Sequence, residues 1–261
     1  MTDATGSGDA RLPISETFVS LQGEGKLAGV PSWFVRMSGC NLRCGWCDTP
    51  YASWKPDGSA RSIDDLVVEA RGAAEKGVRH AVLTGGEPMM FRGLCELSTR
   101  LAAPLAEGGA GMHITIETAG TVIPTDDRWG LACDLMSISP KLASSTPRND
   151  PRDPEGVWAI RHEERRLNMP VLRSLVDRWR DGDAGGVQLK FVVCGAEDIA
   201  EIQTLLAGVP EVPASDVLLM PEGVIPPTEG TKRMLTELCV SRGWRYCPRL
   251  HIELFGNRRG T

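Results

Sequence analysis

The sequence lacks the long apolar runs of membrane proteins, since no stretch approaches the roughly 18 residues that a membrane span requires. Residues 1–10 are rich in Gly, Ser and Asp and contain no apolar segment of the kind found in secretory signals. An excess of positive charge is also absent, because 29 Lys and Arg face 34 Asp and Glu, for a net charge of −5. These absences predict a cytoplasmic protein that binds neither membranes nor nucleic acids.

The composition is otherwise ordinary for a globular protein. Of the 261 residues, 41% are hydrophobic and 24% are charged, which excludes a largely disordered, collagen-like or coiled-coil chain. No internal repeat of about 20 to 50 residues is present, so we do not expect a repeat architecture.

Short runs rich in Val, Ile and Leu alternate with amphipathic stretches along the chain. The runs predict strands over residues 33–37, 80–83, 113–117, 134–139, 187–193, 217–220 and 244–250. The amphipathic stretches predict helices over residues 62–76, 91–106, 170–180, 197–207 and 228–242, the first of them capped by Ser62. This alternation predicts an α/β fold with a parallel sheet, open or curled into a barrel. Its chemistry belongs at the carboxyl ends of the strands.

A polar segment containing Arg and Pro, residues 142–168, interrupts this alternation. Together with the short spacing before the fourth expected strand, it predicts an incomplete barrel. We interpret the segment as an insertion, a candidate lid or partner surface. The expected organisation is a disordered tail over residues 1–11 and a single domain over residues 12–261.

The eight cysteines are the most informative part of the composition. Cys40, Cys44 and Cys47 form a Cx3Cx2C loop directly after the first expected strand, and the other five are scattered. In a chain without secretory features, clustered thiols are more often metal ligands than disulfides. Three thiolates this close can hold three corners of a cubane 4Fe-4S cluster and leave the fourth iron open to a substrate or cofactor.

A structural zinc site is the alternative for this loop, and it requires four ligands in a closed tetrahedron. The loop offers three cysteines, and Asp48 is poorly placed as a fourth ligand because it directly follows Cys47. The ligand count favours iron-sulfur and leaves zinc open. The cysteines at 95, 133, 194, 239 and 247 form no second CxxC pair. We therefore expect no auxiliary cluster and interpret these five as small buried hydrophobic residues.

The second expected strand ends in Thr84-Gly85-Gly86-Glu87-Pro88. Alone, Gly-Gly-Glu-Pro is an ordinary turn between a strand and a helix. One βα unit after the Cx3Cx2C loop, it resembles the GGEP motif of the radical S-adenosylmethionine (SAM) superfamily. The resemblance implies a partial (β/α)6 barrel in which the open iron chelates SAM. It also implies that one-electron reduction cleaves the SAM to a 5′-deoxyadenosyl radical.

Further motifs, in family order, resemble the 7-carboxy-7-deazaguanine synthase family over nearly the whole chain. They occupy residues 14–25, 31–40, 47–49, 117–121, 139–141, 190–193, 220–223, 250–251 and 256–261. The resemblance implies a lyase of deazapurine and queuosine biosynthesis. Such an enzyme converts 6-carboxy-5,6,7,8-tetrahydropterin to 7-carboxy-7-deazaguanine with loss of ammonia. Mg²⁺ as a cofactor, a homodimer, and an electron donor such as flavodoxin or ferredoxin are implied as well.

A carboxylated pterin suits three polar residues near the N-terminus. Its guanidine-like edge can be read by Gln22 or Glu24, and Arg36 can clamp its carboxylate with two parallel hydrogen bonds. The alternative for residues 22–25 is a surface turn. Arg36 lies within an apolar strand, where a charge is costly unless it is paired, so a structural ion pair is its alternative.

The resemblance assigns the remaining site residues. It places Leu21, Gln22, Gly23, Glu24, Arg36, Thr84, His251 and Thr261, the last through its free carboxylate, at the substrate. It places Gly86, Glu87, Ser139, Pro140, Lys141, Met220, Pro221, Glu222 and Gly223 at SAM, and Thr49 at Mg²⁺. A satisfied structural histidine is the alternative for His251.

The chain departs from the family pattern at one position. Ile252 and Glu253 follow the C-terminal histidine, where typical members carry a lysine. Two other functions stay open from the residues alone. A glycyl-radical activase shares the loop and the length but acts on a large partner protein, and a non-catalytic zinc-binding module needs no SAM.

Overall fold

The computed structural model describes residues 10–105, 110–124, 130–181 and 186–261. Its strands form one nine-stranded sheet in the order β3-β1-β2-β4-β5-β6-β7-β8-β9. The strands are β1 Arg11–Leu21, β2 Pro31–Met37, β3 Ser59–Ser62, β4 His80–Gly85, β5 His113–Thr118, β6 Leu135–Ile138, β7 Val187–Val193, β8 Val217–Pro221 and β9 Arg245–Tyr246. In this order, every neighbouring pair from β2 to β9 is parallel. The strand β1 is antiparallel to both of its neighbours, β2 and β3.

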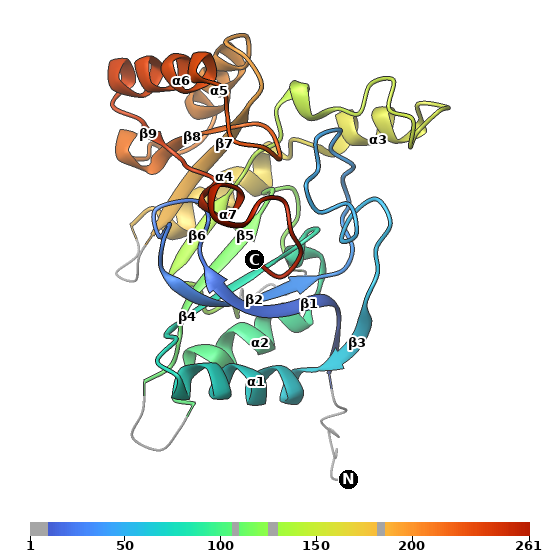
Figure 1. The fold of residues 1–261 in the computed structure, drawn as a ribbon, viewed down its shortest axis with the longest axis vertical. Coiled ribbons are helices and arrows are strands. Elements are labelled where there is room, and N and C mark those ends of the chain that lie inside the picture. The colour runs from blue at the N-terminus through green and yellow to red at the C-terminus, as the bar shows by residue number, and fades with distance from the viewer. Residues whose placement is uncertain (1–9, 106–109, 125–129, 182–185) are drawn as a thin grey trace.

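The helices are α1 Ile63–Glu75, α2 Gly93–Ala102, α3 Val157–Arg165, α4 Met169–Trp179, α5 Asp198–Ala207, α6 Glu229–Arg242 and α7 Leu250–Phe255. Short 3-10 turns are η1 Pro88–Met90, η2 Ala143–Ser145 and η3 Ala214–Asp216. The Oγ of Ser62 accepts a hydrogen bond from the backbone N–H of Asp65, as the capping pattern predicts. Helices α1 and α2 lie side by side on one face of the sheet (Figure 1).

The six central parallel strands, β2 and β4 through β8, confirm the expected α/β architecture. Among the described strands, β3 and β9 remain separate edges of the sheet, so the barrel is partial, as the sequence predicts. The C-terminus returns to the middle of the molecule, while α3 projects at one end (Figure 1). Every helix in the described part of the chain is too short or too polar to span a membrane.

Side chains alternate between the two faces of the sheet with the two-residue period of a strand. In β7, Leu189 and Phe191 pack into the main hydrophobic core, while Lys190 points to the opposite face. The same alternation directs Arg36 of β2 and Glu117 of β5 away from the core. The face of the sheet opposite the main hydrophobic core, which we call the inner face, therefore carries polar groups even where a strand reads as a continuous apolar run.

The structure corrects the sequence predictions at three places. The antiparallel strand β1 and the short β3 were not expected, because β1 is only partly buried and carries no regular apolar alternation. The strand expected over 244–250 is limited to β9, and α7 follows it. The helix α3 lies inside the polar insertion, and its one buried residue is His162, so the segment carries no apolar stripe. Residues 1–9 of the expected tail lie outside the described residues, and β1 begins at Arg11.

Candidate active site

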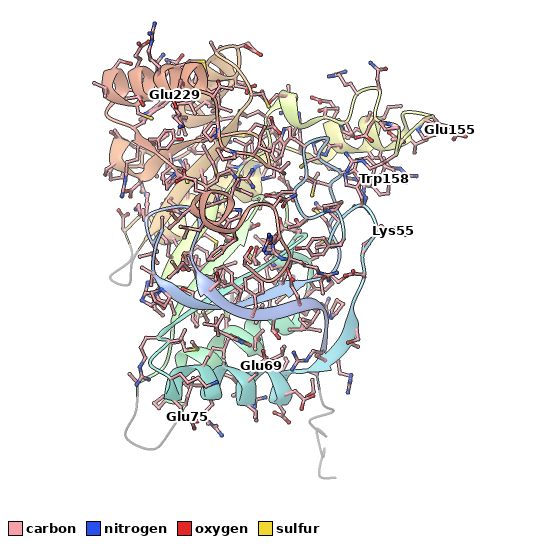
Figure 2. The ribbon with its side chains drawn as sticks, in the orientation of Figure 1. Lys55, Glu69, Glu75, Glu155, Trp158 and Glu229 are labelled. Carbon is pink, nitrogen blue, oxygen red and sulfur yellow. The ribbon has the colours of Figure 1, made fainter. Side chains whose placement is uncertain are left out.

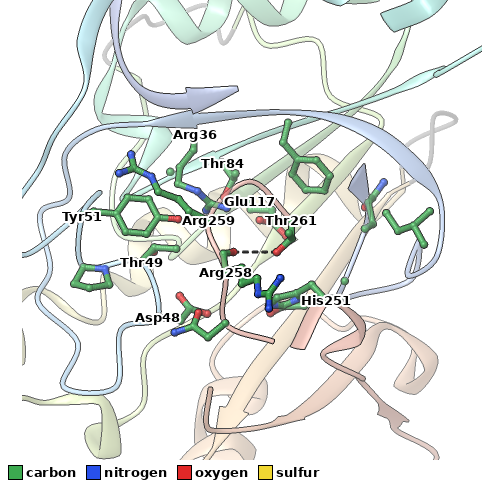
Figure 3. Close-up of a pocket in the computed structure, with 18 residues that line it drawn as sticks. Arg36, Asp48, Thr49, Tyr51, Thr84, Glu117, His251, Arg258, Arg259 and Thr261 are labelled. Carbon is green, nitrogen blue, oxygen red and sulfur yellow. Dashed lines mark hydrogen bonds between the residues drawn. The ribbon is translucent and has the colours of Figure 1, made fainter. Parts of the chain in front are cut away.

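Two adjoining cavities open at the carboxyl ends of the parallel strands. The larger cavity has a volume of about 460 Å³ (Figure 3), and the second, which we call the cysteine cavity, has a volume of about 150 Å³. Six residues line both of them: Glu24, Asp48, Thr49, Thr84, Gly85 and Glu117. The two cavities therefore form one continuous site.

All three clustered cysteines, Cys40, Cys44 and Cys47, line the cysteine cavity. Burial raises the pKa of the Cys40 thiol to about 12, with the nearby Glu87 carboxylate adding to the shift. Burial likewise raises the pKa of Cys44. Because metal ligation needs thiolates, a cation must supply the energy to ionise these groups, as an iron cluster does.

The arrangement of the cysteine sulfurs bears on the choice between iron-sulfur and zinc. Sulfurs bound to one tetrahedral zinc lie about 3.8 Å apart, given Zn–S bonds of about 2.3 Å. Among the described residues, the one set of three ligand atoms within 4.8 Å of one another belongs to Glu24, Asp48 and His251, and the three cysteines form no such set. As the structure places them, the three sulfurs do not converge on one tetrahedral ion. Three cysteine ligands are also one short of a closed zinc site, whereas they can hold three corners of a cubane cluster.

Only part of the residue set expected at SAM reaches the cysteine cavity. Gly86, Ser139, Lys141 and Met220 line it, whereas Glu87, Pro140, Pro221, Glu222 and Gly223 line neither cavity. A Cβ on Gly86 would lie 2.2 Å from the carbonyl oxygen of Gly39, so close backbone packing requires glycine there. Lys141 Nζ donates to the backbone oxygen and to the Oγ of Ser139, each at 2.9 Å.

Glu87 is fully buried and is satisfied within the protein. Its carboxylate accepts hydrogen bonds from Met89 N at 3.1 Å, Thr118 Oγ1 at 2.8 Å and Ala119 N at 2.8 Å. Burial raises its pKa in spite of these three donors. Glu87 thus ties the turn after β4 to the turn after β5, and it lines neither cavity.

The larger cavity collects the residues expected at the substrate and at Mg²⁺. Leu21, Gln22, Gly23, Glu24, Arg36, Thr49, Thr84, His251 and Thr261 all line it. They come from the ends of β1, β2 and β4, from the cysteine loop, from α7 and from the C-terminal residue (Figure 3). Residues that span almost the entire chain therefore meet in one cavity.

Arg36 makes the structural ion pair that was the alternative to a substrate contact, and it also reaches the larger cavity. Its Nε donates to Glu16 Oε1 at 2.7 Å, and the Tyr51 hydroxyl donates to the same oxygen at 2.9 Å. The guanidinium nevertheless lines the cavity. The ion pair offsets the cost of burying Arg36 and fixes its orientation, while the remaining N–H groups stay available to a ligand.

A network of buried charges lies where the two cavities meet. Lys190 Nζ donates to Glu24 and lies 3.6 Å from Glu117 Oε1, and Arg249 bridges Glu24 and Asp48. Burial alone would raise the pKa of Glu24, but Lys190 and Arg249 outweigh it and hold the pKa far below its usual range. Because these carboxylates are already paired with cations, they form an anchored charge network and not a vacant acidic cluster.

Several lining residues were not among the predicted ones. In the larger cavity they include Phe34, Asp48, Tyr51, Glu117, Asn257, Arg258 and Arg259. Lys190 carries the same signal as Arg36, a charge inside an apolar strand, and that signal could have identified it. Tyr51 and Arg249 lie in irregular segments with no local pattern, and only the tertiary structure reveals their partners.

The interpretation of the five scattered cysteines is partly wrong. Cys239 and Cys247 are buried, Cys95 and Cys133 are partly buried, and Cys194 is exposed. The exposed position follows β7 directly, in the turn that leads to α5. Cys247 also has a polar role, since its Sγ accepts a hydrogen bond from Gly25 N at 3.1 Å.

Comparisons with known proteins agree with this geometry. The Radical SAM superfamily model matches residues 34–141, which include the cysteine loop and the Gly-Gly-Glu-Pro turn. A 7-carboxy-7-deazaguanine synthase from Rhodopirellula baltica is 46% identical over 97% of this chain and 92% of its own length. The enzyme of that name from Halobacterium salinarum is 42% identical over 99% of this chain and 96% of its own.

The chain belongs to the 7-carboxy-7-deazaguanine synthase family. A crystal structure of QueE from Escherichia coli is similar to it as well, with a TM-score of 0.61, 25% identity, and coverage of 91% of this chain and 93% of that one. Members of the 7-carboxy-7-deazaguanine synthase family are radical SAM lyases, so this chain is a radical SAM enzyme. Membership of this family implies three cofactors, a 4Fe-4S cluster, SAM and Mg²⁺.

Proposed function

We propose that this protein contracts 6-carboxy-5,6,7,8-tetrahydropterin to 7-carboxy-7-deazaguanine with release of ammonia. The observation that carries the proposal is the convergence of all eight expected substrate residues on one cavity, which adjoins the three cysteines. Family membership with 46% identity to a 7-carboxy-7-deazaguanine synthase supports the same reaction.

The residues of the cysteine cavity suit both cofactors of the radical reaction. Cys40, Cys44 and Cys47 would hold a 4Fe-4S cluster, and Gly86 with Lys141 would line the SAM site. When bound, the reduced cluster and SAM supply a 5′-deoxyadenosyl radical for hydrogen abstraction. Because the cofactor carries this step, the protein contributes orientation and exclusion of water.

The chain's own residues determine how the pterin lies. Arg36, held by Glu16, would clamp the carboxylate, while Glu24 is ionised and faces the cavity as an acceptor for the guanidine-like edge. Gln22 is buried and lines the cavity, and because its Nε2 donates to Ser32 Oγ at 3.0 Å, its Oε1 is the atom that would accept from the pterin. A misplacement of the reacting carbon by about 1 Å would cost roughly 100-fold in rate.

Thr49 is the residue that we propose as a ligand of Mg²⁺. Its side chain lines both cavities, and its Oγ1 lies 3.8 Å from Cys47 Sγ. A hydroxyl oxygen, supplemented by substrate oxygens and water, suits a hard ion that keeps much of its hydration. The hydroxyl would then orient the substrate carboxylate relative to the cysteine cavity.

A homodimer and a flavodoxin or ferredoxin as electron donor, both implied by the resemblance of the sequence motifs, complete the proposal. Light scattering measures the first. Comparing product formation with each reduced donor tests the second, and a donor that sustains turnover at the rate of a chemical reductant supports the assignment.

The reaction is tested with anaerobically reconstituted enzyme, SAM, reductant, Mg²⁺ and the carboxypterin. Mass spectrometry should detect 7-carboxy-7-deazaguanine, and Cys44→Ala should abolish both the product and SAM cleavage. Cleavage of SAM without ring contraction would overturn the substrate and leave the radical chemistry intact. A glycyl-radical activase would instead need a protein substrate, whereas a cavity of about 460 Å³ lies within the range of small-molecule sites.

A further inference from the structure

The cysteine loop has no regular secondary structure of its own. Between β2 and β3, over residues 38–58, the chain forms only turns and bends. Its conformation must therefore be held by other segments. Cys44, the middle cysteine, lies between Arg43 and Gly45, and both of their backbone N–H groups donate to the 142–168 segment.

On one side of Cys44 the contact is made by His162. Arg43 N donates to His162 Nδ1 at 3.2 Å, and His162 Nε2 lies 2.8 Å from Ser145 Oγ. Ser145 Oγ donates its own proton to the Leu142 oxygen at 2.6 Å, so it must accept from Nε2. The neutral imidazole with its proton on Nε2 satisfies all three bonds. His162 is fully buried, and burial lowers its pKa to about 4, so this neutral form prevails at pH 7.

On the other side of Cys44 the contact is made by backbone and by an arginine. Gly45 N donates to the Ser145 oxygen at 2.9 Å, and Gly45 O accepts from Arg152 Nη2 at 2.7 Å. The Arg152 guanidinium stacks over the Trp54 ring at 4.1 Å, and Trp54 Nε1 donates to the Cys44 oxygen at 2.9 Å. Ser145 thus contacts both His162 and Gly45 and links the two sides.

Side-chain packing strengthens the same contact. The guanidinium of Arg43 lies 4.2 Å from the centre of the Trp158 ring and donates to the oxygens of Cys40 and Leu42. Figure 2 shows Trp158 where α3 faces the cysteine loop. The cysteine loop and the insertion therefore share backbone hydrogen bonds, a buried imidazole and a stacked cation.

We infer that the insertion is a buttress that positions Cys44 for the cluster, with His162 as the central positioning residue, and not a lid over the substrate. The structure describes all of residues 142–168, and none of them lines either cavity. The inference rests on the proposed function, in which Cys44 holds the cluster. It adds a contact that the cysteine motif does not contain.

The contact has a chemical consequence for the cluster. Hydrogen bonds to cluster sulfur and groups that orient the ligands both tune affinity and reduction potential. The N–H groups of Arg43 and Gly45 are already bonded to the insertion and are not available to sulfide. Removing the His162 acceptor frees one of these donors and loosens Cys44, so both cluster retention and the cluster spectrum should change.

The test uses anaerobically reconstituted holoenzyme and three variants. His162→Leu removes the acceptor while filling the space, and His162→Asn keeps an acceptor near the position of Nδ1. Val176→Ala is the control, because Val176 is fully buried in α4, outside the insertion. For each protein we would measure iron release to bathophenanthroline disulfonate, the electron paramagnetic resonance spectrum of the reduced cluster, and Tm.

Iron release from His162→Leu should be about tenfold faster than from wild type, since changes in such supporting contacts cost roughly 10- to 100-fold in metal affinity. Its spectrum should shift, His162→Asn should restore both properties, and Val176→Ala should lower Tm without changing either. Wild-type retention and spectrum in His162→Leu, or loss in Val176→Ala equal to that in His162→Leu, would overturn the inference. Product formation by wild type is scored separately, so failure of the proposed reaction remains distinguishable from failure of the buttress.

Discussion

Lys190 Nζ donates to Glu24 across 166 residues of sequence, and both side chains are shielded from solvent. Lys190 belongs to the inner face of β7, and Glu24 lies in the loop after β1. Their ion pair holds the N-terminal hairpin against the parallel sheet at the point where the two cavities meet. The same lysine lies 3.6 Å from Glu117, so one buried cation serves two carboxylates.

Removing that cation should destabilise the fold. Lys190→Met leaves the buried Glu24 short of a partner, which costs about 3 kcal/mol in unfolding free energy. Urea unfolding of the holoenzyme measures the loss. Lys55→Met removes an exposed lysine and should stay within about 0.5 kcal/mol of wild type. The double variant Lys190→Met/Glu24→Gln should recover part of the loss, and a double variant less stable than Lys190→Met would contradict the pairing.

The Glu24 carboxylate should make stability depend on pH. Its pKa is lowered in the folded state, so its contribution is present above the unfolded value of about 4.5 and is lost as pH falls through that value toward the folded pKa. Wild type should therefore exceed Glu24→Gln in unfolding free energy most clearly near pH 6. The difference should shrink toward about pH 4. An advantage that grows on acidification would show that the pKa is raised instead.

Arg36→Lys should weaken substrate binding more than it weakens the fold. A lysine retains the charge beside Glu16 but loses the planar fork that binds a carboxylate with two hydrogen bonds. We expect KM for the carboxypterin to rise roughly 10- to 100-fold with a smaller change in kcat. Arg61→Lys is the matched control, because Arg61 pairs with Glu69 at 2.9 Å and lines neither cavity. Equal effects from the two variants would argue against a substrate role.

Two glycine substitutions should have opposite signs. A Cβ on Gly86 would meet the Gly39 oxygen at 2.2 Å and the Ala52 oxygen at 2.5 Å, both of them backbone atoms, so Gly86→Ala must displace the cysteine loop. We expect loss of SAM cleavage and a destabilisation of about 1 to 3 kcal/mol. Gly72 lies in α1, where a Cβ would meet no atom of the described residues within 4 Å, so Gly72→Ala should stabilise by about 0.5 to 1 kcal/mol. Calorimetry measures the change in stability of each of the two variants.

The parallel architecture and the place of the chemistry were predictable from local pattern. Apolar runs separated by amphipathic stretches identify β4, β5, β7 and β8, because each strand is buried on both faces and needs no distant partner to be recognised. The strand β1 and the helix α3 were missed for the opposite reason. Their burial is supplied by neighbours distant in sequence, and their own residues show no periodic apolar face.

The sequence by itself identified the three cysteines as candidate cluster ligands, the glycine turn after β4 and the family. Close spacing along the chain was enough for the cysteines, because it fixes which ligands can share one cluster. Only the tertiary structure decided the charge partners. It pairs Arg36 with Glu16, Lys190 with Glu24, and Arg249 with Asp48. It also turns Glu87 away from both cavities and sets the insertion against Cys44. A buried polar group must find a partner, and the strand register and loop packing alone determine which partner lies within hydrogen-bond distance.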